Sequence, residues 1–172
     1  NYILEQNQLK EANIWEKIIE ALIAGNCILF VETLEIAFVC DTKKLPMRSI
    51  NKAENEMSVN GPSEAFIEAL RPNTALIRKY VKDENLVFED ISLGEAGKTT
   101  CSLAYISTIA NESLIQEVKR RVSNIEIDYL IDSGQLAQLI EDKTYITEPL
   151  ILSTERPDRV ALHLFEGRIA IL

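Results

Sequence analysis

The chain has 172 residues, enough for one domain or two small lobes with a buried core. Apolar residues make up 47% of the sequence and charged residues 26%, which is ordinary globular usage and argues against wholesale disorder or a fibrous repeat. The formal net charge of -9 at pH 7 argues against nucleic acid as a partner, because phosphate binding draws mainly on lysine and arginine.

Neither the start of the chain nor its most apolar stretch predicts a membrane or export segment. No basic segment, apolar run and small-residue cleavage site follow Asn1, so we expect no secretory signal and interpret the chain as a fragment of a longer protein. The apolar stretch 21–40 contains Asn26, Glu32 and Glu35, which makes it a poor bilayer span.

The cysteines predict no disulfide framework and no zinc site. Cys27, Cys40 and Cys101 are odd in number and scattered, without a closely spaced pair. We therefore expect reduced thiols in an intracellular setting, with Cys27 and Cys101 as small core residues.

The first predicted unit is a helix followed by a hairpin. Apolar residues recur at helical spacing over 9–24, and Gly25 suits the end of that helix. Two short β-branched and aromatic runs, 27–31 and 36–40, predict a pair of strands. The polar, aperiodic stretch 51–61 predicts a separation between a lobe at 1–55 and a second lobe at 56–172.

The second lobe is predicted to mix helices with a second hairpin. Pro62 begins a helix that Pro72 interrupts, and another helix follows over 73–82. The remaining predicted elements are strands at 86–93 and 99–107, helices at 113–122 and 135–140, a helical turn at 128–131, a helix at 157–164 and a last strand at 168–172. The predicted fold class is α/β of the α+β kind, with two small lobes and helices packed on short mixed sheets.

Catalytic motifs are weak. Gly97-Lys98-Thr99 matches the end of a phosphate-binding loop, but a strand pattern follows it where such a loop needs a helix. His163 is the single histidine and has no nucleophile motif beside it. We therefore predict no enzyme activity, no metal and no cofactor.

Two charged clusters are the candidate ligand or partner contacts. The first contains Arg71, Asn73 and Arg78 at a predicted helix break, where planar guanidinium groups suit a carboxylate. The second contains Glu155, Arg156 and Asp158 at a predicted helix start. The alternative is that both clusters are helix caps and ion pairs that fix lobe geometry.

Several independent motifs follow one another from about residue 60 onward. They include Gly61-Pro62-Ser63-Glu64-Ala65-Phe66, Glu68-Ala69-Leu70-Arg71-Pro72-Asn73, Leu76-Ile77-Arg78, Asp132-Ser133-Gly134, Thr154-Glu155-Arg156-Pro157-Asp158-Arg159-Val160 and Glu166-Gly167-Arg168-Ile169-Ala170-Ile171-Leu172. In these motifs and their order the sequence resembles the A subunits of GerA-family spore germinant receptors.

This resemblance implies a receptor rather than a catalyst. Family A subunits join a hydrophilic N-terminal domain to a membrane region and act with B and C subunits in the spore inner membrane. The chain is then the soluble domain, expected on the cytoplasmic, spore-core side. We expect it to contribute to germinant sensing, signal transduction and receptor assembly, with a nutrient such as an amino acid or a sugar as candidate ligand. The alternative is a pure protein-protein interaction platform, with the nutrient bound only by other subunits.

Overall fold

The computed structural model describes residues 9–32, 34–41, 56, 61–62, 64–141 and 151–172. The chain divides into two compact units, Asn1–Ser49 with Lys82–Glu84 and Ile50–Val81 with Asn85–Leu172. The described part contains five helices and two three-stranded antiparallel sheets, which confirms the predicted α+β class. The predicted boundary between residues 55 and 56 falls in 42–60, where only Glu56 is described, so it stays a prediction.

The first unit is a three-stranded sheet with one helix. Its elements are β1 (Leu9–Ala12), α1 (Trp15–Ile23), β2 (Cys27–Phe30) and β3 (Ala37–Cys40). The strand order is β1-β3-β2, and both ladders are antiparallel. Ile18 of α1 packs into a small core with Ala12, Ala37 and Val39. The helix ends at Gly25 with a φ of 84°, which a glycine adopts without strain.

Two predictions for the first unit are wrong in detail. The predicted helix over 9–24 is shorter at its start, because Leu9–Ala12 pairs with Cys40 to Ala37 as a strand. Helical spacing could not show this, since the pairing partner lies far along the chain. Cys27 is exposed rather than a core residue, because it begins the edge strand β2.

The second unit is built on a sheet of one long hairpin and a short third strand. The hairpin is β4 (Leu86–Leu93) and β5 (Thr99–Ile106), and β6 (Ala170–Ile171) adds to β5 on the far side. The register places Leu86 opposite Ile106 and Leu93 opposite Thr99. This confirms the predicted second hairpin and narrows the predicted last strand to two residues.

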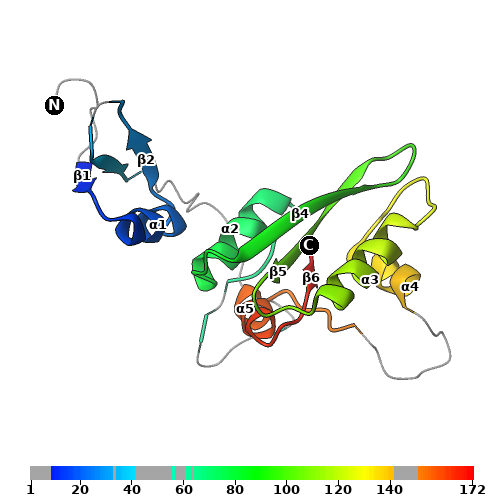
Figure 1. Ribbon diagram of the computed structural model, residues 1–172. Helices are drawn as coiled ribbons and strands as arrows, with labels where there is room; N and C mark the ends of the chain where they lie inside the picture. The colour runs from blue at the N-terminus through cyan, green and yellow to red at the C-terminus, as the bar shows by residue number, and fades with distance from the viewer. Residues whose placement is uncertain (1–8, 33, 42–55, 57–60, 63, 142–150) are drawn as a thin grey trace. The chain divides into compact units, whose positions relative to one another are not determined.

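Helices cover both faces of this sheet. Ala104 and Ile106 face one core with α2 (Leu70–Tyr80) and α5 (Pro157–Phe165). Cys101, on the opposite face of β5, joins a second core with α3 (Glu112–Ser123) and α4 (Ser133–Ile140). Figure 1 shows α3 and α4 together beside the β4–β5 hairpin. The unit therefore has three layers, and α2 and α5 share one of them.

Two predicted helical segments have another structure. Pro72 lies in the first turn of α2 and does not interrupt it, because backbone N–H groups of a first turn need no partner in the helix. The described residues from Glu64 to Ala69 are not helical. The predicted turn at 128–131 is extended instead, since Tyr129 forms a parallel bridge with Gly97.

Candidate functional site

The two predicted charged clusters lie on neighbouring elements. The first is carried by α2 and the second by the start of α5, and these helices pack through a shared core that includes Ile77 and Leu164. The backbone N–H of Phe66 also donates to the carbonyl of Glu155 at 2.8 Å. We call the surface formed by residues 64–80 and 154–159 the α2/α5 face.

Asn73 fastens the segment before α2 to the helix. Its side chain is buried, with 8% of the residue exposed. Its Oδ1 accepts the backbone N–H of Ile67 at 2.9 Å, and its Nδ2 donates to the carbonyl of Ile67 at 2.6 Å. Both polar atoms of the amide are thus used within the chain, which is the behaviour of a structural brace.

Glu56 is held by three residues around the start of α5. Its carboxylate accepts from the Thr154 hydroxyl at 2.6 Å and from the Arg159 guanidinium at 2.8 Å. Its own backbone N–H donates to the Glu155 carboxylate at 2.8 Å. We call Glu56, Thr154, Glu155 and Arg159 the Glu56 clamp. It anchors residue 56 to a position nearly a hundred residues further along the chain.

Arg156 and Asp158 pair with one another. The guanidinium donates twice, from Nε at 3.1 Å and from Nη2 at 2.5 Å, to the two carboxylate oxygens. This forked geometry is the strong form of an arginine–carboxylate pair. The hydrogen bond from Arg156 lowers the pKa of Asp158 from its ordinary value, and the same bond raises the pKa of Arg156.

Tyr80 and Glu64 extend the network along α2. The Glu64 carboxylate accepts from the Lys79 ammonium at 2.6 Å and from the Tyr80 hydroxyl at 2.7 Å. The hydrogen bond from Lys79 is the main cause that lowers the pKa of Glu64. Burial, followed by the Glu64 carboxylate, raises the pKa of Tyr80 well above its ordinary value, with Asp158 contributing from α5. The tyrosine therefore stays protonated and acts as a donor.

Arg71 and Arg78 differ from the other predicted residues. They are seven positions apart in α2, so they lie on one helix face, opposite the buried Asn73 and Leu76. Both are exposed. The Arg78 guanidinium lies over the Phe88 ring, 4.7 Å from its centroid, and stacking of this kind leaves the edge of the guanidinium available for further hydrogen bonds.

The turn that resembles a phosphate-binding loop uses its amides within the protein. The N–H of Glu95 donates to the Ile127 carbonyl at 3.2 Å, and the N–H of Gly97 donates to the Asp128 carbonyl at 2.9 Å. Thr99 then begins β5, so no helix follows Lys98. Two amides that a phosphate loop would offer to its ligand are therefore occupied by backbone.

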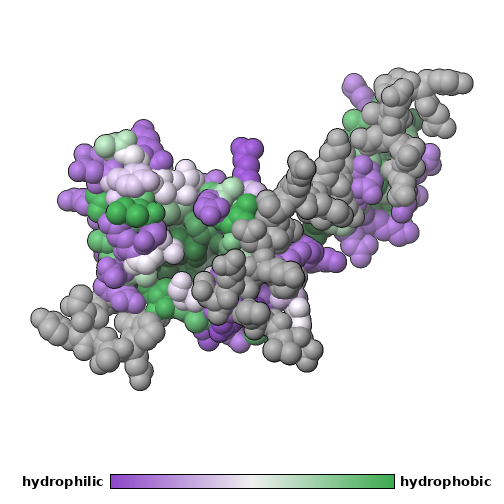
Figure 2. Space-filling view, turned by 180° about the vertical axis from the view of Figure 1, so that it is seen from behind, coloured by the Kyte–Doolittle hydropathy of each residue, from purple (hydrophilic) through white to green (hydrophobic). Residues whose placement is uncertain are grey.

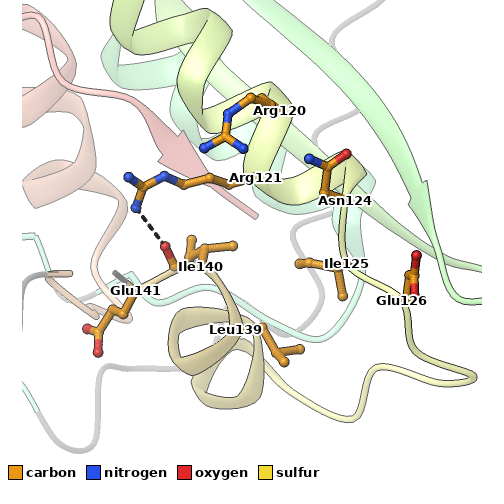
Figure 3. A pocket seen from close by; sticks show the side chains of 8 residues that line it. All are labelled: Arg120, Arg121, Asn124, Ile125, Glu126, Leu139, Ile140 and Glu141. Carbon is orange, nitrogen blue, oxygen red and sulfur yellow. Dashed lines mark hydrogen bonds between the residues drawn. The ribbon is translucent and has the colours of Figure 1, made fainter. Parts of the chain in front are cut away.

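A shallow pocket lies elsewhere, between the end of α3 and α4 (Figure 3). It has a volume of about 310 Å³, and its lining includes Arg120, Arg121 and Glu141. The Arg121 guanidinium donates to the Ile140 carbonyl at 2.9 Å and to Glu117 at 2.7 Å, so it is committed to the fold. None of the six predicted contact residues lines this pocket.

Comparison with known proteins decides the family. The family model described as Bacillus/Clostridium GerA spore germination protein matches residues 1–172. The chain belongs to the GerA family. This confirms the resemblance, and the match extends through the N-terminal third.

GerA-family relatives match almost the whole chain. It is 39% identical over 164 residues to Spore germination protein KA of Bacillus subtilis (strain 168), covering 95% of this chain and 30% of that protein. It is 43% identical over 157 residues to Spore germination protein B1 of the same organism, covering 91% of this chain and 32% of that one. The chain thus spans about a third of the length of these curated relatives.

A solved structure of the GerA family has the same fold. The crystal structure of the N-terminal domain of the A subunit of the Bacillus megaterium spore germinant receptor GerK3 matches with a TM-score of 0.69 and 34% identity. The match covers 96% of this chain and 58% of that chain. The predicted fold class and the predicted kinship with germinant-receptor A subunits are both confirmed.

The described residues of this GerA-family chain contain neither a candidate bilayer span nor a candidate metal cluster. There, no helix combines the length and the apolar character needed to cross a bilayer. The same residues contain no group of three or more histidine, cysteine or acidic side chains that could hold a metal ion. His163 lies in α5 with its Nδ1 2.9 Å from a carboxylate oxygen of Glu166.

Sequence reasoning found both clusters of the α2/α5 face but missed several residues that hold it together. The missed residues are Glu56, Glu64, Lys79, Tyr80 and Arg159. Arg159 lies in the family motif from Thr154 to Val160, and that motif could have indicated it as a candidate residue. Glu56 had none, because it lies in an aperiodic polar stretch. The contact roles of the six predicted residues stay predictions.

Proposed function

We propose that this chain is the N-terminal domain of an A subunit in a nutrient germinant receptor, where it contributes to germinant sensing, signal transduction and assembly. The observation that carries the proposal is the match to the GerK3 A-subunit domain, at 34% identity over 96% of this chain. The proposed partners are B and C subunits, and the proposed location of the whole receptor is the spore inner membrane. An amino acid or a sugar is the proposed nutrient.

The six predicted residues of the α2/α5 face fall into two groups with different proposed roles. Asn73, Glu155, Arg156 and Asp158 make hydrogen bonds inside the chain, so their proposed role is to hold the face in shape. Arg71 and Arg78 project from α2 instead, and no side chain among the described residues forms an ion pair with either. Their proposed partner is therefore a carboxylate, either of a nutrient or of another subunit.

A second candidate function is that of an interaction platform without nutrient binding. The observation that favours it is an exposed aromatic pair in the first unit. Trp15 and Phe30 are 63% and 61% exposed, and their ring centroids are 6.5 Å apart. Large exposed aromatic side chains are typical of protein interfaces. Figure 2 shows hydrophobic residues interspersed with hydrophilic ones on the face seen from behind.

The proposed role includes no catalytic step. The backbone hydrogen bonds of the Gly94–Gly97 turn support this, because the N–H groups of Glu95 and Gly97 donate to carbonyls of the chain and are not available to a phosphate. Measured nucleotide hydrolysis by the purified chain would overturn this part of the proposal.

Calorimetric titration of the purified chain with amino acids and sugars separates the two candidate functions. Direct sensing predicts saturable binding of one nutrient, weakened at least tenfold by Arg71→Ala and little changed by Lys98→Ala, an exposed cation on the hairpin. If no nutrient gives a heat of binding and a receptor subunit still co-purifies with the chain, the interaction platform is supported and direct nutrient sensing by this domain is excluded. Failure in both assays would contradict the receptor role.

A further inference from the structure

Two cysteines of the first unit lie directly opposite each other. Cys27 begins β2, Cys40 ends β3, and the antiparallel register pairs them. Opposite residues of antiparallel strands point to the same face of the sheet, with Cα atoms about 4.5–5.5 Å apart. A disulfide requires Cα atoms about 4.4–6.8 Å apart and Cβ atoms about 3.5–4.5 Å apart. The register meets the Cα requirement, and forming the bond requires the two Cβ atoms to move closer than the roughly 4.5–5.5 Å that is typical of directly opposite residues.

The two thiols share the sheet face turned away from α1. Ala37 and Val39 pack with α1 in the core, and alternation along β3 places Cys40 on the other side. The two differ in access. Cys27 lies on an edge strand and is exposed, whereas Cys40 lies on the central strand between β1 and β2 and is 6% exposed.

We propose that Cys27 and Cys40 form a redox modification site that a small-molecule disulfide, such as glutathione disulfide, converts to a cross-strand disulfide. The exposed Cys27 thiolate attacks the reagent, forming a mixed disulfide and releasing one small-molecule thiolate. The Cys40 thiolate then attacks Sγ of Cys27 and displaces the second thiolate. The two cysteines are oxidised, the reagent is reduced to two thiols, and the two cysteine protons pass to these or to solvent.

The burial of Cys40 determines which of the two thiols reacts first. A reagent in solution meets Cys27 first, and Cys40 resolves the adduct from the neighbouring strand. The product joins the edge strand β2 covalently to the central strand β3, which limits opening of this hairpin. Cys101 takes no part, because it is 5% exposed and packs in the core that β5 shares with α3 and α4.

The test incubates the purified 172-residue chain with glutathione disulfide and counts its thiols. The chain has three cysteines, so the proposal predicts a fall from three free thiols to one, with a mass loss of two hydrogens and no retained glutathione. Protease digestion then yields a peptide pair that links Cys27 to Cys40. Dithiothreitol restores three thiols. This measurement needs no variant, so a folding defect cannot obscure it.

Two variants test the order of events. Cys40→Ala is expected to trap one glutathione on Cys27, and Cys27→Ser is expected to take up none at the buried Cys40. Cys101→Ser serves as the matched control and should form the cross-strand disulfide as the wild type does. A wild-type chain that keeps a stable glutathione adduct, or that links two chains through Cys27, would overturn the proposal.

Discussion

Asn73 and Ile67 are joined by two hydrogen bonds, at 2.9 Å to the Ile67 N–H and at 2.6 Å to its carbonyl. One buried amide thereby satisfies both polar backbone groups of a residue in a non-helical segment. Ile67 needs such a brace because it lies in neither a helix nor a strand that would supply these bonds. The second charged cluster contacts the same segment, through the bond from Phe66 to the Glu155 carbonyl.

Replacing Asn73 is therefore expected to loosen the α2/α5 face. Asn73→Ala should lower the free energy of unfolding by about 2–3 kcal/mol, because it removes both bonds and leaves two backbone groups poorly satisfied. Asn73→Asp keeps the acceptor for the Ile67 N–H but places a buried carboxylate oxygen against the Ile67 carbonyl, so it should cost at least as much. Urea unfolding followed by circular dichroism measures both. Equal stability of Asn73→Ala and wild type would show that the Asn73 side chain does not stabilise this segment.

The Glu56 clamp predicts coupling between residues far apart in sequence. Glu56→Ala removes the acceptor for Thr154 and Arg159, and Thr154→Val removes one donor to it. We expect losses of about 1–2 kcal/mol for the first change and about 1 kcal/mol for the second. The double variant should cost less than their sum, since the two changes remove one shared bond. Strict additivity in the same urea experiment would show that the bond contributes nothing.

The two glycines of the β4–β5 turn should respond differently to alanine. Gly94 has a φ of 90°, and a Cβ there would lie 2.6 Å from the Gly97 carbonyl oxygen and 2.9 Å from that of Asp128. Gly94→Ala is therefore expected to cost about 2 kcal/mol or more. At Gly97 the obstacle is the Tyr129 side chain, which is 60% exposed and can move. Gly97→Ala should thus be the milder variant, and the opposite order of melting temperatures would contradict the turn geometry.

The paired carboxylates predict a loss of stability in acid. Glu64 and Asp158 have pKa values lowered in the folded chain from ordinary values of 4.5 and 3.8. The two carboxylates contribute fully to the free energy of unfolding above the pKa values that they have in the unfolded chain, so the contribution is present at neutral pH. It is lost as the pH falls through the lower pKa values that they have in the folded chain. The free energy of unfolding should fall below about pH 4.5.

A matched variant isolates one of these carboxylates. Asp158→Asn cannot titrate, so its stability should fall less than that of wild type as the pH is lowered through the ordinary Asp pKa of 3.8 and below. An identical pH dependence of the two proteins would mean that the pair with Arg156 does not stabilise the fold.

The elements that sequence patterns predicted are those set by local residues. Gly25 and Gly167 end helices with positive φ, and the β4–β5 hairpin follows from alternation on either side of a glycine-containing turn. The missed strand Leu9–Ala12 depends on pairing with β3, and local spacing carries no information on that pairing. Pro72 was misread because its effect depends on its place within the helix, which spacing did not fix.

The candidate site was predictable in its parts and not in its assembly. Arginines beside proline marked both clusters in the sequence. Their meeting depends on α2 and α5 packing on one face of a sheet, which requires the tertiary fold. The clamp at Glu56 likewise joins residues about a hundred positions apart, so no window along the chain contains both partners.

Nutrient germination of spores that carry the full-length receptor subunit with Arg71→Ala and Arg78→Ala tests the central claim most directly. The account predicts a loss of the nutrient response, with normal amounts of the subunit and a melting temperature of the isolated chain lowered only by the small amount expected from losing the Arg78–Phe88 contact. Lys98→Ala is the control and should germinate as wild type does. Normal germination of the double variant, or a loss fully explained by a lower melting temperature, would contradict a signalling role for the exposed arginines of the α2/α5 face.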